Sequence, residues 1–154
     1  MSVTSWRITK ARYSGEAFSG EGARVYGGRW NSIGNPLVYT SEHASLAVLE
    51  LLVHLGSSRG LDNYVIIACS FDEGLVERIG VRKLPRNWAG SPALVDLQRM
   101  GDQWISEARS AVLEVPSAVL PIERNYLINP RHPDFSMIRF EDPEPLALDA
   151  RLVD

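Results

Sequence analysis

The sequence predicts an α+β fold, with one compact domain in which mixed or antiparallel sheets are flanked by helices. The chain has 154 residues, which is the size of one domain. Its 45% hydrophobic content and formal net charge of −3 exclude an intrinsically disordered chain. Strand-like and helix-like segments follow one another irregularly, without the strand–helix–strand repeat of a parallel α/β fold. No internal repeat or long linker divides residues 1–154, so we expect a single domain.

The chain is predicted to open with a strand and a long loop. β-forming residues mark a strand over residues 6–13. Residues 14–36 hold six of the twelve glycines and show little regular periodicity. A Gly-rich loop of this length in a small domain is uncommon unless it binds a ligand.

Two strands and a helix are predicted to follow. Residues 37–40 form a short apolar strand, and Ser41 is a favourable N-cap for a helix over residues 41–55. The run YVIIACSF at residues 64–71 is continuously apolar, which is typical of a buried central strand.

The C-terminal half is predicted to combine one helix with short strands. Ser91 and Pro92 are favourable first residues for a helix that extends to about Arg109, in which Gly101 is a weak point. Asn125 and Asn129 are predicted to form turns. Strand signals occur at residues 111–115, 117–120, 137–140 and 146–148.

The helix over residues 41–55 carries one carboxylate among aliphatic residues. Because aliphatic side chains cover almost its whole circumference, we expect it to be buried. His43, Glu50 and His54 interrupt this surface along one narrow stripe. Glu50 could bond backbone or an arginine, bind a metal together with His54, or act as a catalytic carboxylate in a cleft wall. Glu50 is the best single candidate for chemistry in the chain.

The Gly-rich loop contains groups suited to a nucleotide. Arg29 offers a planar fork for phosphate, and Trp30 and Tyr39 offer aromatic faces. The spacing matches neither a P-loop nor a Rossmann fingerprint. These residues point to a ligand with phosphate and an aromatic ring, although a purely structural loop is an equal alternative.

Charge and cysteine content narrow the classes of protein. A pI near 5.6 argues against non-specific nucleic-acid binding. The single cysteine, Cys69, cannot form an internal disulfide, and no apolar run approaches the roughly 20 residues of a membrane span. The first ten residues lack the order of a secretory signal. We therefore expect a cytoplasmic protein that binds neither membrane nor DNA itself.

Two long motifs resemble one known family. They are GARVYGGRWNSIGNPLVYTSEHASLAVLELLVH and, later in the chain, VPSAVLPIERNYLINPRHPDF. Both resemble the RES domain, which is named after an arginine, a glutamate and a serine. Arg29, Glu50 and Ser117 match these three positions, and Tyr39 matches the family's usual tyrosine.

The resemblance implies a fold and an activity. RES proteins are toxins of type II toxin–antitoxin systems, similar in fold to ADP-ribosyltransferase toxins. They deplete NAD by cleaving its nicotinamide–ribose bond, and some transfer the ADP-ribose to phosphate or to a protein. NAD is then a substrate, and neither a cofactor nor a metal is implied. The expected partner is an Xre-like helix-turn-helix antitoxin that covers the active site, in a complex that could contain a toxin homodimer.

The candidate site residues fall into two sets. The catalytic set is Glu50, Arg29 and Ser117, and the substrate-binding set is Arg7, Tyr39, Trp30 and Asn31. Glu50 would stabilise the positive charge that develops on the ribose, Arg29 and Arg7 would hold phosphates, and Tyr39 would stack on nicotinamide. Ser117 would bond the nicotinamide amide or position Glu50. The alternatives are a protein mono-ADP-ribosyltransferase, a non-catalytic nucleotide-binding module and, less favoured without a basic surface, an RNase-type toxin.

Overall fold

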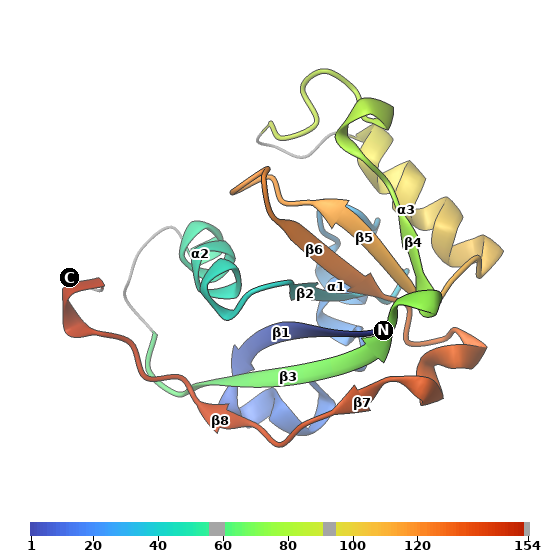
Figure 1. Ribbon diagram of the computed structural model, residues 1–154. Coiled ribbons are helices and arrows are strands. Elements are labelled where there is room, and N and C mark those ends of the chain that lie inside the picture. The colour runs from blue at the N-terminus through green and yellow to red at the C-terminus, as the bar shows by residue number, and fades with distance from the viewer. Residues whose placement is uncertain (56–60, 91–94, 153–154) are drawn as a thin grey trace.

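A curled, eight-stranded mixed sheet organises the described part of the chain (Figure 1). The computed structural model describes residues 1–55, 61–90 and 95–152. The strands are β1 (Ser2–Lys10), β2 (Val38–Ser41), β3 (Tyr64–Asp72), β4 (Val76–Arg78), β5 (Val112–Pro116), β6 (Arg124–Ile128), β7 (Arg139–Phe140) and β8 (Glu144–Pro145). They follow the order β4-β5-β6-β2-β1-β3-β7, and β8 also pairs with β3. All pairs are antiparallel except β4–β5, which confirms the predicted α+β class with a mixed sheet.

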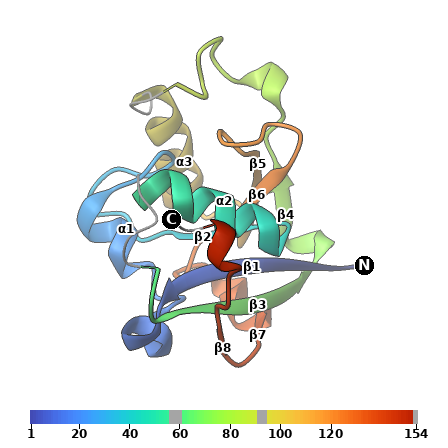
Figure 2. The ribbon, with the colours of Figure 1, turned by 90° about the vertical axis from the view of Figure 1, so that its left-hand side faces the viewer.

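The helices lie around this sheet (Figures 1 and 2). The α-helices are α1 (Glu21–Tyr26), α2 (Ala44–Leu55) and α3 (Val95–Glu107). Five 3-10 helices connect other elements: η1 (Ala11–Glu16), η2 (Glu73–Leu75), η3 (Val81–Lys83), η4 (Pro133–Met137) and η5 (Ala150–Leu152). Helix α2 contacts β1 and β2, and α3 packs beside β4 and β5. No helix in the described ranges is long and apolar enough to cross a membrane.

Two apolar clusters occupy the two faces of β5 and β6. Leu113 and Leu127 belong to the cluster under α3, together with Trp104. Val112 and Ile128, their neighbours along the strands, belong to the other cluster. The alternation follows from the two-residue period of a strand, which sends successive side chains to opposite faces.

Several element boundaries differ from the sequence-based expectation. Strand β1 begins and ends earlier than residues 6–13, because the chain turns into η1 at Ala11. Helix α2 begins at Ala44, since Ser41 is the last residue of β2 and not a helix cap. The Gly-rich loop contains the short helix α1.

The sheet corrects four further expectations. Residues 117–120 form no strand, whereas Asn125, predicted in a turn, lies in β6. Strand β3 alternates between buried and less buried residues, and on one side it pairs only with the short β7 and β8. Of the strands predicted at 137–140 and 146–148, only residues 139–140 form one (β7); residues 146–148 form no strand, and β8 lies at 144–145, where the turn between the two strands was predicted. Strands β7 and β8 pair with β3 and not with each other. The predicted helix start at Ser91 and Pro92 lies outside the described residues.

Helix α2 is less buried than its composition predicts. Leu46 and Ala47 are buried, but Leu49 is 41% exposed and Val53 is 64% exposed. The expectation of a helix buried on nearly all sides is therefore wrong. The reason is that α2 packs with one side against β1 and β2, so that its opposite side, with Leu49 and Val53, is turned away from the sheet. Figure 2 shows α2 at the surface that faces the viewer.

Candidate functional site

The carboxylate of Glu50 is held by two side chains from the sheet. Its Oε1 accepts a hydrogen bond from Ser117 Oγ at 2.7 Å and another from Asn125 Nδ2 at 2.8 Å. Glu50 is partly buried in the middle of α2, and Ser117 is buried directly after the end of β5. These two donors fix Oε1 beside the end of β5 and the start of β6, and among the described residues no cation forms an ion pair with Glu50.

Asn125 is the residue that sequence reasoning missed. It lies in β6 between Ser41 of β2 and Val115 of β5, with which it is in register. Its Oδ1 accepts a hydrogen bond from Ser41 Oγ at 2.9 Å. Residues 124–128 (RNYLI) show no polar–apolar alternation, and the available signal was the β-forming run Tyr126–Ile128 directly after Asn125.

The glycines of the loop allow Tyr39 to approach the backbone. Gly27 has φ of +73°, and a Cβ on Gly28 would lie 2.6 Å from the Tyr39 hydroxyl oxygen. The Tyr39 hydroxyl donates to Asn31 Oδ1 at 2.6 Å and accepts from the Trp30 amide at 3.1 Å. Burial of the phenol raises its pKa, so Tyr39 stays protonated as a donor. The loop and β2 are thereby joined into one unit.

The structure corrects the predicted roles of Trp30 and Asn31. The Trp30 side chain is only 2% exposed and packs with Leu97 and Trp104, so its ring offers no stacking face. Asn31 is fully buried, and its Nδ2 donates to the carbonyls of Ala23 at 2.8 Å and Asn35 at 2.9 Å. Both residues therefore build the loop and do not present side chains to a ligand.

Helix α3 packs against the backbone of the Gly-rich loop. A Cβ on Gly101 would lie 1.7 Å from the Trp30 carbonyl oxygen, so only glycine permits this contact. Gln98 Nε2 donates to the Gly28 carbonyl at 2.9 Å. Asp102 Oδ1 accepts from the Ser32 amide at 3.0 Å. Gly101, predicted as a weak point of the helix, is thus a packing requirement.

Arg29 lies in this loop, and its cationic side chain is partly buried. Its Nη1 donates to the carbonyls of Trp88 at 3.1 Å and Gly90 at 2.9 Å. In the part of the chain that the structure describes, it forms no ion pair with a carboxylate. Its charge is therefore not neutralised by those residues.

Arg7 is a second partly buried cation of this kind. Its Nε donates to the Ala17 carbonyl, and its Nη1 donates to the Tyr39 carbonyl at 3.1 Å. Burial lowers the pKa of its guanidinium, which shows that desolvation outweighs any opposite charge nearby. Among residues 1–55, 61–90 and 95–152 it has no ion-pair partner.

The predicted residues form connected groups. Glu50 and Ser117 touch directly, and Tyr39, Asn31 and Trp30 form the second group, to which Arg7 is joined through the Tyr39 carbonyl. Tyr39 and Ser41 are two residues apart in β2, so they lie on one face of the sheet. The side-chain hydrogen bonds of Arg29 go to the 88–90 segment, and within the described ranges none goes to another predicted residue.

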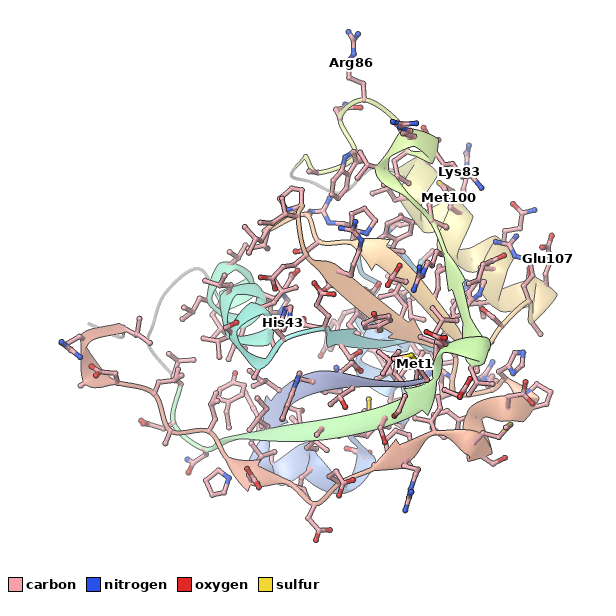
Figure 3. The ribbon with its side chains drawn as sticks, in the orientation of Figure 1. Met1, His43, Lys83, Arg86, Met100 and Glu107 are labelled. Atoms are coloured by element: carbon pink, nitrogen blue, oxygen red, sulfur yellow. The ribbon has the colours of Figure 1, made fainter. Side chains whose placement is uncertain are left out.

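The polar stripe predicted on α2 does not form one site. His43, labelled in Figure 3, lies just before the helix and is exposed. His54 is exposed as well, whereas Glu50 is hydrogen-bonded to Ser117 and Asn125 of the sheet side. His43 Nδ1 lies 3.0 Å from Glu123 Oε1, and this carboxylate raises the pKa of the imidazole. Glu42, His43 and Glu123 form the one group with ligand atoms close enough for a metal among the described residues, and Glu50 is not part of it.

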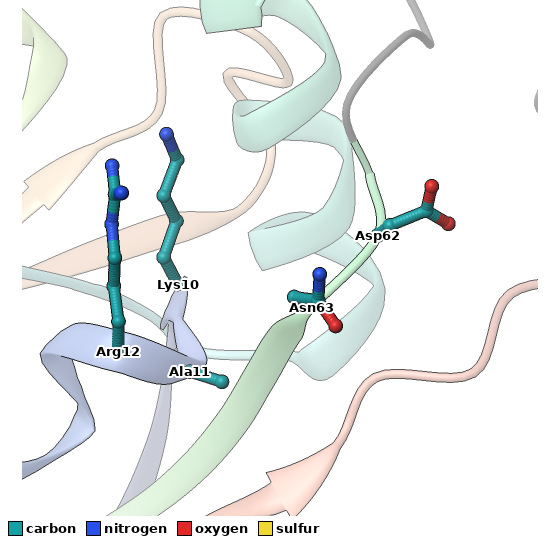
Figure 4. A pocket seen from close by; sticks show the side chains of 5 residues that line it. All are labelled: Lys10, Ala11, Arg12, Asp62 and Asn63. Atoms are coloured by element: carbon teal, nitrogen blue, oxygen red, sulfur yellow. The ribbon is translucent and has the colours of Figure 1, made fainter.

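A separate open pocket lies at the end of β1. It has a volume of about 450 Å³ and is lined by Lys10, Ala11, Arg12, Asp62 and Asn63. Figure 4 shows Lys10 and Arg12 pointing in the same direction. Arg12 lies 4.8 Å from the ring centroid of Tyr13, and Asp62 adds a carboxylate. None of the predicted site residues lines this pocket.

Nearly the whole chain is similar to known proteins of one family. Residues 4–149 match the family described as RES domain. The chain is 36% identical over 149 residues to Toxin Res of Photorhabdus laumondii, with 96% of each chain covered. It is 39% identical over 158 residues to the Prs ADP-ribosylating toxin of Sphingobium sp., covering 99% of this chain and 98% of that relative.

A solved structure shares the fold. A chain in the crystal structure of the M. tuberculosis MbcT–MbcA toxin–antitoxin complex superposes with a TM-score of 0.79. The match covers 96% of this chain and 85% of the other, at 19% sequence identity. At that identity the likeness supports the fold alone.

Proposed function

The chain belongs to the RES domain family of toxins, and on that basis we propose that it cleaves the nicotinamide–ribose bond of NAD. The observation that carries the proposal is the Glu50 carboxylate, held by Ser117 and Asn125 with no cation bound to it among the described residues. A fixed anion of this kind suits a reaction in which positive charge develops in the substrate.

The chemistry needs one negative group. When the bond from ribose C1′ to the nicotinamide nitrogen breaks, its electron pair neutralises the pyridinium ring, and nicotinamide leaves without a general acid. Positive charge remains on the ribose as an oxocarbenium-like state. Glu50 stabilises that charge, and the oxygen of water or of phosphate then bonds to C1′. With water, the proton passes to solvent and ADP-ribose is released.

Arg29 and Arg7 are the proposed phosphate ligands. Each guanidinium donates to backbone carbonyls and has no carboxylate partner among the described residues. A buried cation without a counter-charge is unfavourable, and a pyrophosphate would supply that charge. We propose that Tyr39 contacts nicotinamide, because its hydroxyl is fixed and Trp30 lies in the core.

The proposal is tested by incubating purified, antitoxin-free protein with NAD, with and without phosphate, and identifying the products by chromatography. We expect nicotinamide together with ADP-ribose or ADP-ribose phosphate. Glu50→Gln keeps the shape of the side chain and should abolish the reaction while its thermal unfolding stays cooperative. NAD that is bound and returned unchanged by the wild type would indicate a non-catalytic binding module and refute the proposal.

A second candidate function is ADP-ribosylation of a protein. It is favoured by the 39% identical Sphingobium relative, which is named an ADP-ribosylating toxin. The same Glu50 chemistry applies, with a protein nucleophile in place of water. Labelled NAD added to a cell extract would then mark a protein band before bulk NAD falls.

We propose that an Xre-like antitoxin binds and neutralises this toxin. The named complex of the structural neighbour, a toxin with its antitoxin, supports this partner class. Co-expression with the adjacent open reading frame should give a complex without NAD cleavage, and its mass would show whether it contains one toxin chain or a homodimer. Toxin activity that is unaffected by the adjacent gene product would contradict that pairing.

A further inference from the structure

Two residues outside the predicted site determine how the Glu50 carboxylate is presented. Asn125 donates to Glu50 Oε1, and Ser41 contacts the other end of the Asn125 amide. Neither residue was expected to take part in chemistry, since Ser41 was assigned to a helix cap and Asn125 to a turn. Strand pairing places the two opposite each other in β2 and β6.

The Ser117 hydroxyl can donate its hydrogen bond only to Glu50. Ser117 Oγ accepts the amide hydrogens of Val119 and Leu120, each at 3.1 Å. Both of its lone pairs are thereby used, and its single hydroxyl hydrogen remains. That hydrogen points to Glu50 Oε1 at 2.7 Å.

The Asn125 amide is likewise restricted to one orientation. With its Nδ2 toward Glu50, both contacts are hydrogen bonds, because the Ser41 hydroxyl donates to Asn125 Oδ1 at 2.9 Å. The reversed amide would place an oxygen 2.8 Å from the Glu50 carboxylate oxygen, which is a repulsive contact between two acceptors. Ser41 is buried, so water does not readily replace its hydroxyl as the donor.

We propose that Asn125 and Ser41 are positioning residues that hold Glu50 in its reactive orientation. Two donors occupy Oε1, and in the described part of the chain no hydrogen bond reaches Oε2. The carboxylate plane is set by groups at the end of β5 and within β6, so Oε2 is presented in one direction. A free glutamate side chain samples many rotamers, and removing that freedom before the reaction is what preorganisation requires. This inference rests on the proposed function, in which Glu50 faces the developing charge.

A positioning role and a merely structural role predict different kinetics. If Asn125 only stabilised the sheet, its loss would lower the melting temperature and leave kcat of the folded fraction unchanged. If it positions Glu50, kcat falls while KM for NAD stays nearly constant, because the lost interaction acts in the transition state.

The test compares four variants in the NAD cleavage assay. Asn125→Ala and Asn125→Leu should lower kcat by about 10- to 100-fold, the range expected for a hydrogen bond to a charged group. Ser41→Ala, which acts through Asn125, should lower kcat by about 3- to 10-fold. The double variant Ser41→Ala/Asn125→Ala should be no slower than Asn125→Ala, because both changes remove one coupled unit.

Thr40→Val is the matched control. Thr40 precedes Ser41 in β2 and is equally buried; its hydroxyl donates to the Tyr126 carbonyl at 2.7 Å and lies 2.8 Å from Ser5 Oγ, whose hydroxyl can donate to it. It lies on the other face of the sheet, so its replacement should lower the melting temperature and leave kcat unchanged. A kcat loss in Thr40→Val equal to that in Asn125→Ala, or an unchanged kcat in Asn125→Ala, would overturn the inference.

Crystal structures provide a readout that requires no NAD cleavage. The Glu50 carboxylate should have one orientation in the wild type, and a shifted orientation or several orientations in Asn125→Ala. If the wild type leaves NAD intact, the proposed function fails while the crystal structures still decide the positioning role. An unchanged single Glu50 orientation in Asn125→Ala would refute it.

Discussion

Replacing Gly101 with alanine separates two physical effects that have opposite signs. Gly101 lies within helix α3, where alanine in place of glycine stabilises an exposed helix by about 1 kcal/mol. A Cβ at this position, however, would lie 1.7 Å from the Trp30 carbonyl oxygen and 2.8 Å from its carbonyl carbon. These are backbone atoms, which cannot move aside as a flexible side chain does.

To relieve this clash, the added Cβ and the Trp30 carbonyl oxygen must move apart by more than 1 Å. The loss of unfolding free energy depends on the interactions between α3 and the loop that this movement weakens. Overpacking of a core costs about 1–3 kcal/mol. Exposing the whole Trp30 side chain would cost at most about 4–6 kcal/mol, from about 150–250 Å² at about 25 cal/mol per Å². The Gln98 and Asp102 bonds to the loop would weaken as well. We expect a net loss of about 2–4 kcal/mol of unfolding free energy, since the helix propensity gain offsets part of the cost.

Urea unfolding followed by tryptophan fluorescence and circular dichroism measures this loss. In a thermal unfolding scan, the same loss should lower the melting temperature by about 5–15 °C. Gly22→Ala is the matched control, because it lies in helix α1 and an added Cβ meets nothing within 4 Å. That variant should be as stable as the wild type or slightly more stable. A Gly101→Ala protein at least as stable as the wild type would refute the reasoning.

Three further predictions concern groups outside the reaction. Burial raises the pKa of Cys69 to about 11, so native protein at pH 8 should react with a thiol reagent far more slowly than urea-unfolded protein; equal rates would contradict this. Because Glu123 raises the pKa of His43 above 6.5, the pair should stabilise the fold fully below about pH 6.5 and lose that effect as the pH rises through the raised value. An NMR titration in which Glu123→Gln leaves the His43 pKa unchanged would refute that cause. Asp102→Ala should cost about 2–3 kcal/mol in urea unfolding. Exposed Asp96→Ala should cost less than about 0.5 kcal/mol, and equal losses in both variants would contradict a specific role for Asp102.

The local pattern of the sequence singles out Glu50 as the candidate carboxylate. Glu50 stood out because an acidic residue among aliphatic residues of one helix needs a partner or a cleft. For Ser117, 67 positions later, two roles were predicted, bonding the nicotinamide amide or positioning Glu50, and the structure contains a Ser117–Glu50 hydrogen bond of 2.7 Å. The helix itself was predicted with a start three residues too early, since the role of Ser41 depends on the pairing of β2 with β6.

The errors at Trp30 and Asn125 have a common physical origin. An aromatic residue in a Gly-rich loop can face a ligand or the core, and the side chain of Trp30 enters the core because Gly101 lets α3 approach its backbone. An asparagine near a proline favours a turn, but in β6 Asn125 pairs with Ser41 and Val115 from two other strands. In both cases the deciding neighbour is far away in the sequence.

The sequence by itself determined the α+β class and the family, and it nominated Arg29, Glu50 and Ser117 as candidate site residues, because these depend on composition, local periodicity and two long motifs. Only the tertiary structure decided which groups hold Glu50, which aromatic residue lies in the core, and why Gly101 is required. Register between strands and contact between a helix and a loop are set by the packing of the whole chain. Local sequence carries little information about either, and the arrangement around Glu50 depends on both.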